Sequence, residues 1–190
     1  QKDLKEMLSA RGSRKSSLIY LGIIIGLIGI FMPLQSGPDW LSDPILPLVW
    51  SWFPVFLMIS MITDSIAGER ERNTLETLLA SRLSDKSILF GKIGGSVVYG
   101  WSISILGNLI AAITINVTNP AGGIQFYSPG LFAVLLLVPL VIGTLMSGLG
   151  VLVSLNAPTA RSAYQKLSLV MLAFWFIPMF AINFIPEGVQ

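Results

Sequence analysis

Long apolar segments occupy most of this chain and constrain its fold more than any other feature. Each segment is close to the ~20 residues that an α-helix needs to cross a lipid bilayer. A backbone in contact with lipid must satisfy its own hydrogen bonds, so these segments are predicted to be helices. The predicted spans cover residues 17–33, 45–67, 88–115, 130–155 and 167–185.

The composition agrees with an all-α, polytopic helical membrane protein. Hydrophobic residues make up 53% of the 190 residues and charged residues 12%, whereas about a quarter of the residues are charged in a soluble domain. The mean hydropathy is +0.75. We therefore expect a single transmembrane domain over residues 1–190 and no sizeable soluble domain.

The positively charged side chains indicate how the chain is oriented. All twelve Lys and Arg lie in residues 2–15, 70–92 and 161–166. The remaining connecting segments contain none, and these are residues 34–44, 116–129 and 186–190. Cytoplasmic loops of membrane proteins carry an excess of Lys and Arg. We therefore expect a multi-pass protein of the cell membrane with a cytoplasmic N-terminus and with Gln190 on the external side.

Several kinds of reactive residue are missing from the sequence. It has no Cys and no His, which excludes disulfides, thiol chemistry, imidazole bases and the common zinc sites. It also lacks the GxxxxGK[ST] pattern that cradles nucleotide phosphates. We predict no catalytic residue and no metal site. An intramembrane enzyme is disfavoured, because the spans offer no pair of facing carboxylates either.

The segment of residues 64–92 is densely charged in an otherwise apolar part of the chain. Asn73 is predicted to cap a short helix whose third residue is Glu76, which is the spacing of a capping box. Apolar residues follow at helical spacing, at Leu75, Leu78, Leu79 and Leu83. Ser84 is predicted to cap the next span, so the short amphipathic helix and the span are separate elements.

The stretch DSIAGERERNTLETLLASRLSDKSILFGK, residues 64–92, resembles the signature of ABC-2 type transporter permeases. In that family an acidic residue ends the second span, a GE-x-E-x-x-T-LE-x-LL core follows, and GK opens the third span. Residues 1–16 resemble the family's amphipathic cytoplasmic helix, with Leu4, Met7 and Leu8 on one face. The segment VSLNAPTARSAYQK resembles the connection before the fifth span.

The resemblance implies a permease subunit of an ATP-binding cassette (ABC) transporter, of the exporter type whose membrane fold is shared by the ABCG and O-antigen transporters. Such a subunit forms the translocation pathway in the lipid bilayer with a second permease copy or a paralogue, and it couples to ABC ATPase subunits. ATP and Mg²⁺ then belong to the ATPase subunit, so we expect no cofactor bound by this chain and no nucleic-acid partner. The family usually has six spans, so a sixth helix is expected beyond Gln190.

In this family the loop between the second and third spans, here residues 69–84, contains a coupling helix that docks on the ATPase subunit. Carried over residue by residue, the residues that form or brace this contact are Glu69, Glu71, Arg72, Thr74, Glu76, Leu78, Leu79 and Arg82. A capped helix transmits a rigid-body displacement, and the charges around it provide an orientation-specific docking surface. The alternative for such a loop is a solvated segment that only sets the orientation.

Polar residues inside the spans are the other candidates for function. Ser104 and Asn108 in the third span would line a substrate path, or they would form ordinary interhelical hydrogen bonds. Small residues also recur at a spacing of four, which mostly indicates close helix packing within one subunit. Examples are Ser96 with Gly100 and Gly143 with Ser147.

A membrane anchor is an alternative function from a different class. Its charged loop would dock a cytoplasmic partner without any transport. The two hypotheses differ in ATPase coupling, since an anchor would bind its partner without altering the partner's turnover. An ATP-independent secondary transporter is disfavoured, because it normally shows internal repeats or buried charge and the sequence shows neither. The apolar spans are compatible with ions, lipids, peptides or drugs as the substrate.

Overall fold

The computed structural model describes residues 13–73, 84–120 and 123–182. The regular elements in this part of the chain are helices, which confirms the all-α prediction. In chain order they are α2 (Ser13–Gly26), η1 (Leu27–Phe31), α3 (Met32–Ser36), α4 (Asp39–Ser42), α5 (Ile45–Trp50), α6 (Phe53–Thr63), η2 (Asp64–Gly68), α7 (Glu69–Glu71), α9 (Asp85–Thr118), α10 (Pro129–Asn156) and α11 (Ala160–Ile182). The segments η1 and η2 are short π-helical stretches.

The described residues contain four stretches that are long and apolar enough to cross a membrane: Leu18–Ser36, Ile45–Glu71, Lys86–Thr118 and Pro129–Asn156. These stretches coincide with the first four predicted spans. The fifth predicted span falls on α11, and its last residues lie outside the described part of the chain. Most of the predicted amphipathic helix and of the predicted coupling helix also lies outside it, in residues 1–12 and 74–83.

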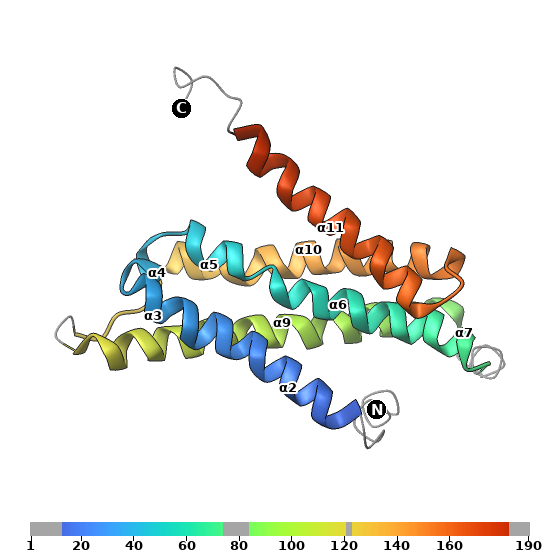
Figure 1. The fold of residues 1–190 in the computed structure, drawn as a ribbon, viewed down its shortest axis with the longest axis horizontal. Helices are drawn as coiled ribbons and strands as arrows, with labels where there is room; N and C mark the ends of the chain where they lie inside the picture. The colour runs from blue at the N-terminus through green and yellow to red at the C-terminus, as the bar shows by residue number, and fades with distance from the viewer. Residues whose placement is uncertain (1–12, 74–83, 121–122, 183–190) are drawn as a thin grey trace.

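Three helices, α6, α9 and α10, pack against one another at the centre of the bundle (Figure 1). The side chain of Met58 of α6 fits between the other two helices because each of them has a glycine at the position that faces it. A Cβ on Gly100 of α9 would lie 2.3 Å from Met58 Cγ, and one on Gly143 of α10 would lie 2.1 Å from Met58 Sδ. Nearby, Ser96 Oγ donates to Ser147 Oγ at 3.2 Å. The small residues at these positions thus serve packing within this chain, as predicted.

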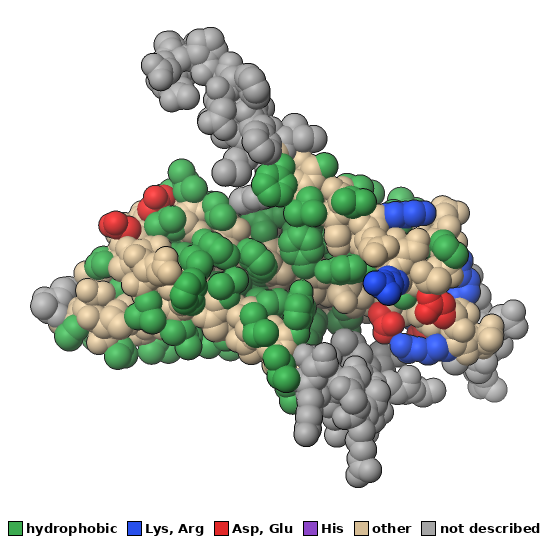
Figure 2. All heavy atoms as spheres, viewed as in Figure 1, with side chains coloured by type: hydrophobic (Ala, Val, Ile, Leu, Met, Phe, Trp, Pro, Cys, Tyr) green, Lys and Arg blue, Asp and Glu red, His purple; other side chains and the backbone are tan. Residues whose placement is uncertain are grey.

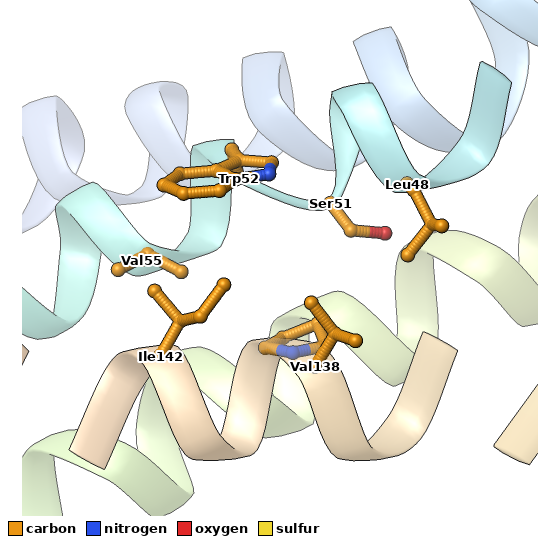
Figure 3. Close-up of a pocket in the computed structure, with 7 residues that line it drawn as sticks. Leu48, Ser51, Trp52, Val55, Val138 and Ile142 are labelled. Atoms are coloured by element: carbon orange, nitrogen blue, oxygen red, sulfur yellow. The ribbon is translucent and has the colours of Figure 1, made fainter. Parts of the chain in front are cut away.

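The helix of the second predicted span is interrupted between α5 and α6. Ser51 and Trp52 form a turn there, and Pro54 stands in the first turn of α6, where its missing N–H costs nothing. Pro139 lies inside α10 opposite this turn, and the two irregularities line a shallow recess that has no interior space for a water molecule (Figure 3). Ligand pockets enclose roughly 300 to 1,000 Å³. This recess is therefore too small to be a substrate site.

The helices α2 and α11 diverge from the long axis of the bundle (Figure 1). The first half of α11 packs on α6, α10 and η2, where Leu167 and Met171 are buried. Its second half projects away from the other helices (Figure 1). Side chains such as Leu169 and Val170 are exposed on α11. A lipid bilayer or a second subunit would cover surfaces of this kind, because they are too apolar to face water.

Candidate functional site

Charged side chains gather at the end of the bundle where α7 stops and α9 begins. Figure 2 shows Lys and Arg side chains beside Asp and Glu at this end, next to a surface that is mostly hydrophobic. The charged residues Glu69–Glu71 form α7, which continues the helix of α6 and η2. Their side chains therefore start from an ordered helix end, and each of them contacts a different part of the bundle.

Glu69 pairs with Lys92 near the beginning of α9. Glu69 Oε1 lies 2.8 Å from Lys92 Nζ, and the two side chains are only 16% and 10% exposed. The Lys92 ammonium group also donates to the backbone oxygen of Ser65 in η2. Removing charges from water costs several kcal/mol per ion unless they are well paired and hydrogen-bonded. This pair therefore fixes the end of the second-span helix against the third-span helix.

Arg70 reaches the C-terminal end of α10. Its Nη1 donates to the backbone oxygen of Leu155 at 2.8 Å, and its Nη2 to that of Ser154 at 3.4 Å. The last carbonyl groups of a helix have no partner within the helix, and the helix dipole gives this end a partial negative charge. A guanidinium group satisfies both requirements and so holds α7 to the end of α10.

Glu71 reaches the N-terminal end of α11. The backbone N–H of Ala160 donates to Glu71 Oε1 at 2.6 Å. The first N–H groups of a helix are also without intrahelical partners, and this end carries a partial positive charge. The hydroxyl oxygen of Thr159 accepts from the backbone N–H of Ser162 at 3.0 Å and serves a second of these groups. The Glu71 carboxylate is thus an N-terminal cap supplied from another helix.

Arg72 turns back along its own helix to Asp64. The distance from Arg72 Nη2 to Asp64 Oδ1 is 3.3 Å, and the side chains are 59% and 45% exposed. Gly68 makes room for this contact, since a Cβ there would lie 2.6 Å from Asp64 Oδ1. An exposed pair of this kind contributes little to stability. It differs from the contacts of Arg70 and Glu71 because it joins no second helix.

Comparison with known protein families decides what kind of protein carries this site. Residues 12–189 match the family model described as ABC-2 family transporter protein. The chain belongs to the ABC-2 transporter family. It is therefore a permease of an ABC transporter, a membrane-embedded component that is not itself catalytic. No match was found among curated proteins or among solved structures.

The chemistry of this site in the ABC-2 permease is ion pairing and helix capping. Among the residues that the structure describes, no group of three or more acidic side chains is placed to hold a metal ion. Each charged side chain of α7 is instead engaged with another element of the bundle. Such an arrangement fixes the position of a helix end.

The predicted coupling residues of the permease fall into two groups. Glu69, Glu71 and Arg72 are described, and the first two contact other helices of the same chain. Their position is suited to bracing the loop that follows. The others lie outside the described residues, and their contact with an ATPase stays a prediction: Thr74, Glu76, Leu78, Leu79 and Arg82.

The two predicted caps of the loop have different outcomes. Ser84 is extended, and its Oγ accepts from the backbone N–H of Ser87 at 3.3 Å, which confirms it as the N-cap of α9. Asn73 has a φ of 55°, and its N–H donates to the backbone oxygen of Arg70 at 3.1 Å. Asparagine often adopts this left-handed conformation just after a helix, whereas an N-cap residue is extended. Asn73 therefore terminates α7, and the helix that it is predicted to cap lies outside the described residues.

The other candidates, Asn108 and Ser104, lie inside the bundle and are 2% and 1% exposed. Asn108 Nδ2 donates to the backbone oxygen of Ser104 at 2.9 Å and to Ser51 Oγ at 3.5 Å. Tyr127 Oη donates to the backbone oxygen of Asn108 at 3.1 Å and accepts from Trp40 Nε1 at the same distance. Asn108 thus makes an interhelical hydrogen bond to Ser51, whereas Ser104 Oγ is buried without a hydrogen-bond partner. A role of the two residues in lining a substrate path stays a prediction.

Tyr127 stands in the connection before α10 and links it to α4 and α9. Burial raises the pKa of Tyr127 to about 12, and the hydrogen bond from Trp40 opposes the shift. Its hydroxyl group therefore stays protonated at neutral pH and can donate. The result is a polar tie at the end of the bundle opposite to α7.

Sequence reasoning did not single out Lys92 or Arg70 as site residues. Lys92 carries a usable signal, because a charge at the start of an apolar span needs a partner or water. Arg70 carries none, because its acceptors are the backbone oxygens of Ser154 and Leu155. Every residue has a backbone oxygen, so the residue types do not indicate which oxygen accepts from Arg70. Only the packing of the chain shows it.

Proposed function

We propose that this ABC-2 permease forms a translocation pathway with a second permease copy or a paralogue, and that ATP hydrolysis on separate ABC ATPase subunits drives export through it. The observation that carries the proposal is the family match over residues 12–189. The described helices of the single chain pack closely and leave no room for a substrate between them, which supports a path between two chains. The chain's polar residues Ser104 and Asn108 are buried, and its recess is small.

The contact with the ATPase subunit is proposed for the loop of residues 69–84. The helices on both sides of this loop are fixed to the bundle, since Glu69 of α7 pairs with Lys92 of α9. A force applied to the loop therefore reaches the second and third spans together. This property supports a coupling role, because transmission of movement needs discrete, rigid elements.

The charged end is proposed to face the cytoplasm and Gln190 the external side of the cell membrane. The helix α7, the start of α9 and the start of α11 lie at the same end of the structure (Figure 1). These elements contain Arg70, Lys86, Lys92, Arg161 and Lys166, and Arg72 directly follows α7. The opposite end carries Asp39 and Asp43 and no basic residue in its connecting segments. The positive-inside rule supports this orientation.

The test of the coupling role is the ATP turnover of the complex that is purified through a tag on this chain and reconstituted in liposomes. Glu71→Ala and Glu76→Ala are expected to leave membrane insertion intact and to lower the vanadate-sensitive turnover. Asp39→Ala removes an exposed carboxylate at the opposite end and serves as the matched control. Wild-type turnover in both glutamate variants would contradict the coupling role.

The membrane-anchor hypothesis predicts a different result in the same experiment. An anchor would retain the partner in the purified complex, but the ATP turnover of the partner would equal that of the free partner. Stimulation or inhibition of the turnover by the wild-type chain therefore separates the two functions before any variant is compared.

A further inference from the structure

Arg70 and Glu71 are neighbours in the sequence, yet they bind the two helices that meet at one cytoplasmic connection. This connection, residues 157–159, joins the end of α10 to the start of α11 and is called the α10–α11 corner below. We propose that the side chains of Arg70 and Glu71 form a strap, which makes the α10–α11 corner move together with the coupling loop. The proposal rests on the proposed function. It adds that a displacement of the coupling loop reaches the α10–α11 corner as well as the second and third spans.

The charges of the strap match the helix ends that they contact. The Arg70 guanidinium lies on the carbonyl groups that end α10, and the Glu71 carboxylate lies on the N–H group that begins α11. The dipole of a helix favours a cation at its C-terminus and an anion at its N-terminus. With the two side chains exchanged, both contacts would be repulsive. The arrangement is therefore specific for this corner.

Small apolar residues bring the corner close to the second-span helix. Ala157 of the corner, Ala67 of η2 and Ala163 of α11 are fully or almost fully buried in one cluster. Alanine side chains let the backbones approach closely, as small residues do between membrane helices. The strap thus spans a short, packed interface, and the corner is held by contact as well as by hydrogen bonds.

Together with the pair of Glu69 and Lys92, the strap ties α7 to three other helices. These contacts reach α9 through Lys92, α10 through Leu155 and α11 through Ala160. A helix end that is bonded to three neighbours cannot move independently of them. A displacement that enters at the coupling loop is therefore shared by α9, α10 and α11. In this account Arg70 and Glu71 are positioning residues, since they act through the helices that they hold.

The absence of cysteine from the sequence permits a local reporter of the corner. Arg161 lies in the first turn of α11, is exposed and serves as the site of an Arg161→Cys reporter. Its rate of labelling by a membrane-impermeant maleimide is measured on the complex with its co-purified ATPase, without nucleotide and after trapping with ATP and vanadate. The reporter complex must first show vanadate-sensitive ATP turnover.

The strap predicts that trapping changes the labelling rate of the reporter when Arg70 and Glu71 are present. The change is expected to be lost in Glu71→Ala and in Arg70→Ala, and to be partly retained in Glu71→Gln, which keeps an oxygen acceptor for the Ala160 N–H. The control Asp39→Asn should respond as the wild type does. Rescue by Glu71→Gln separates positioning from loss of folding, as do equal yields of the complex.

Two results would overturn the strap while leaving the proposed function in place. One is a change in labelling that persists in the double variant Arg70→Ala/Glu71→Ala. The other is a complex with vanadate-sensitive turnover whose reporter does not respond to trapping in any background. If no ATPase co-purifies with the chain, the proposed function fails and the strap fails with it.

Discussion

Lys92 Nζ lies 2.8 Å from Glu69 Oε1, and this pair joins the end of the second-span helix to the beginning of the third. Glu69 is the first residue of the loop 69–84 and Lys92 follows the loop in α9, so the base of the loop is closed by a largely buried ion pair. A loop that is closed in this way cannot move without moving both spans. The pair is therefore the structural basis of the coupling proposed for this permease.

Loss of one partner of this pair is predicted to destabilise the protein more than loss of both. Glu69→Gln or Lys92→Met leaves a single charge at a site of low exposure, and breaking such a pair costs about 3 to 5 kcal/mol. The double variant removes both charges and is expected to be more stable than either single variant. The measurement is thermal unfolding of the detergent-solubilised protein in a double-mutant cycle. Additive losses in the double variant would show that the two side chains are not coupled.

The polar tie at the opposite end is predicted to contribute to stability and not to coupling. Tyr127→Phe removes the hydroxyl group that accepts from Trp40 and donates to Asn108. An unsatisfied buried polar group costs about 1 to 3 kcal/mol. Tyr127→Phe and Asn108→Ala should therefore lower the unfolding temperature while the ATP turnover per folded complex stays at the wild-type value.

Ser102→Ala is the control for this prediction, because Ser102 is exposed and its hydroxyl group binds only within its own helix. It should unfold at the wild-type temperature. A change in turnover at wild-type stability in Asn108→Ala would instead assign Asn108 to the transport path.

Glycine at position 100 is predicted to be required for the packing of α9 on α6. A Cβ at Gly100 would lie 2.8 Å from the backbone oxygen of Pro54, which cannot move as a side chain can. Overpacking of a well-packed interior costs typically about 1 to 3 kcal/mol. Gly100→Ala should therefore unfold at a lower temperature. Gly95→Ala, on the same helix with nothing within 4 Å of its Cβ, should not, and equal effects of the two would contradict this packing.

The proposed orientation predicts opposite accessibility of two exposed positions. Ile124→Cys lies in the connection between α9 and α10, where Ile124 is 99% exposed, and it should react with an impermeant maleimide added outside intact cells. Lys166→Cys lies near the start of α11 and should react only after the membrane is permeabilised. The reverse pattern would show that the charged end faces outward.

The parts of the fold that depend on composition and on local spacing were predictable from the sequence. The helices α9 and α10 follow from apolar length alone, and Ser84 caps α9 because a serine before a helix binds its first N–H groups whatever surrounds it. The continuation of the second-span helix into α7 was not predicted, because a run of charges such as Glu69–Arg72 reads as a loop when its partners are unknown. Those partners become available only when the bundle is assembled.

The position of Asn73 at the end of α7 was not predicted for a related reason. Asparagine is favoured both at the beginning of a helix and just after its end, so the residue type alone does not distinguish the two positions. The capping-box spacing to Glu76 favoured the first. The structure has the second, because α7 runs up to Glu71 and the chain must leave that helix at Asn73. The contacts of Arg70 and Glu71 were equally hidden, since their partners are backbone atoms of residues 154–160.

The central claim, that this chain is the membrane subunit of an ATP-driven transporter coupled through its charged loop, is tested most directly by what co-purifies with it. The measurement is a pull-down of the full-length protein from its native membranes in mild detergent, followed by mass spectrometry. The account predicts recovery of a subunit with a phosphate-binding GxxxxGK[ST] motif, and loss of that subunit when residues 69–83 are scrambled. Recovery of the permease without any ATPase, under conditions that preserve other membrane complexes, would contradict it.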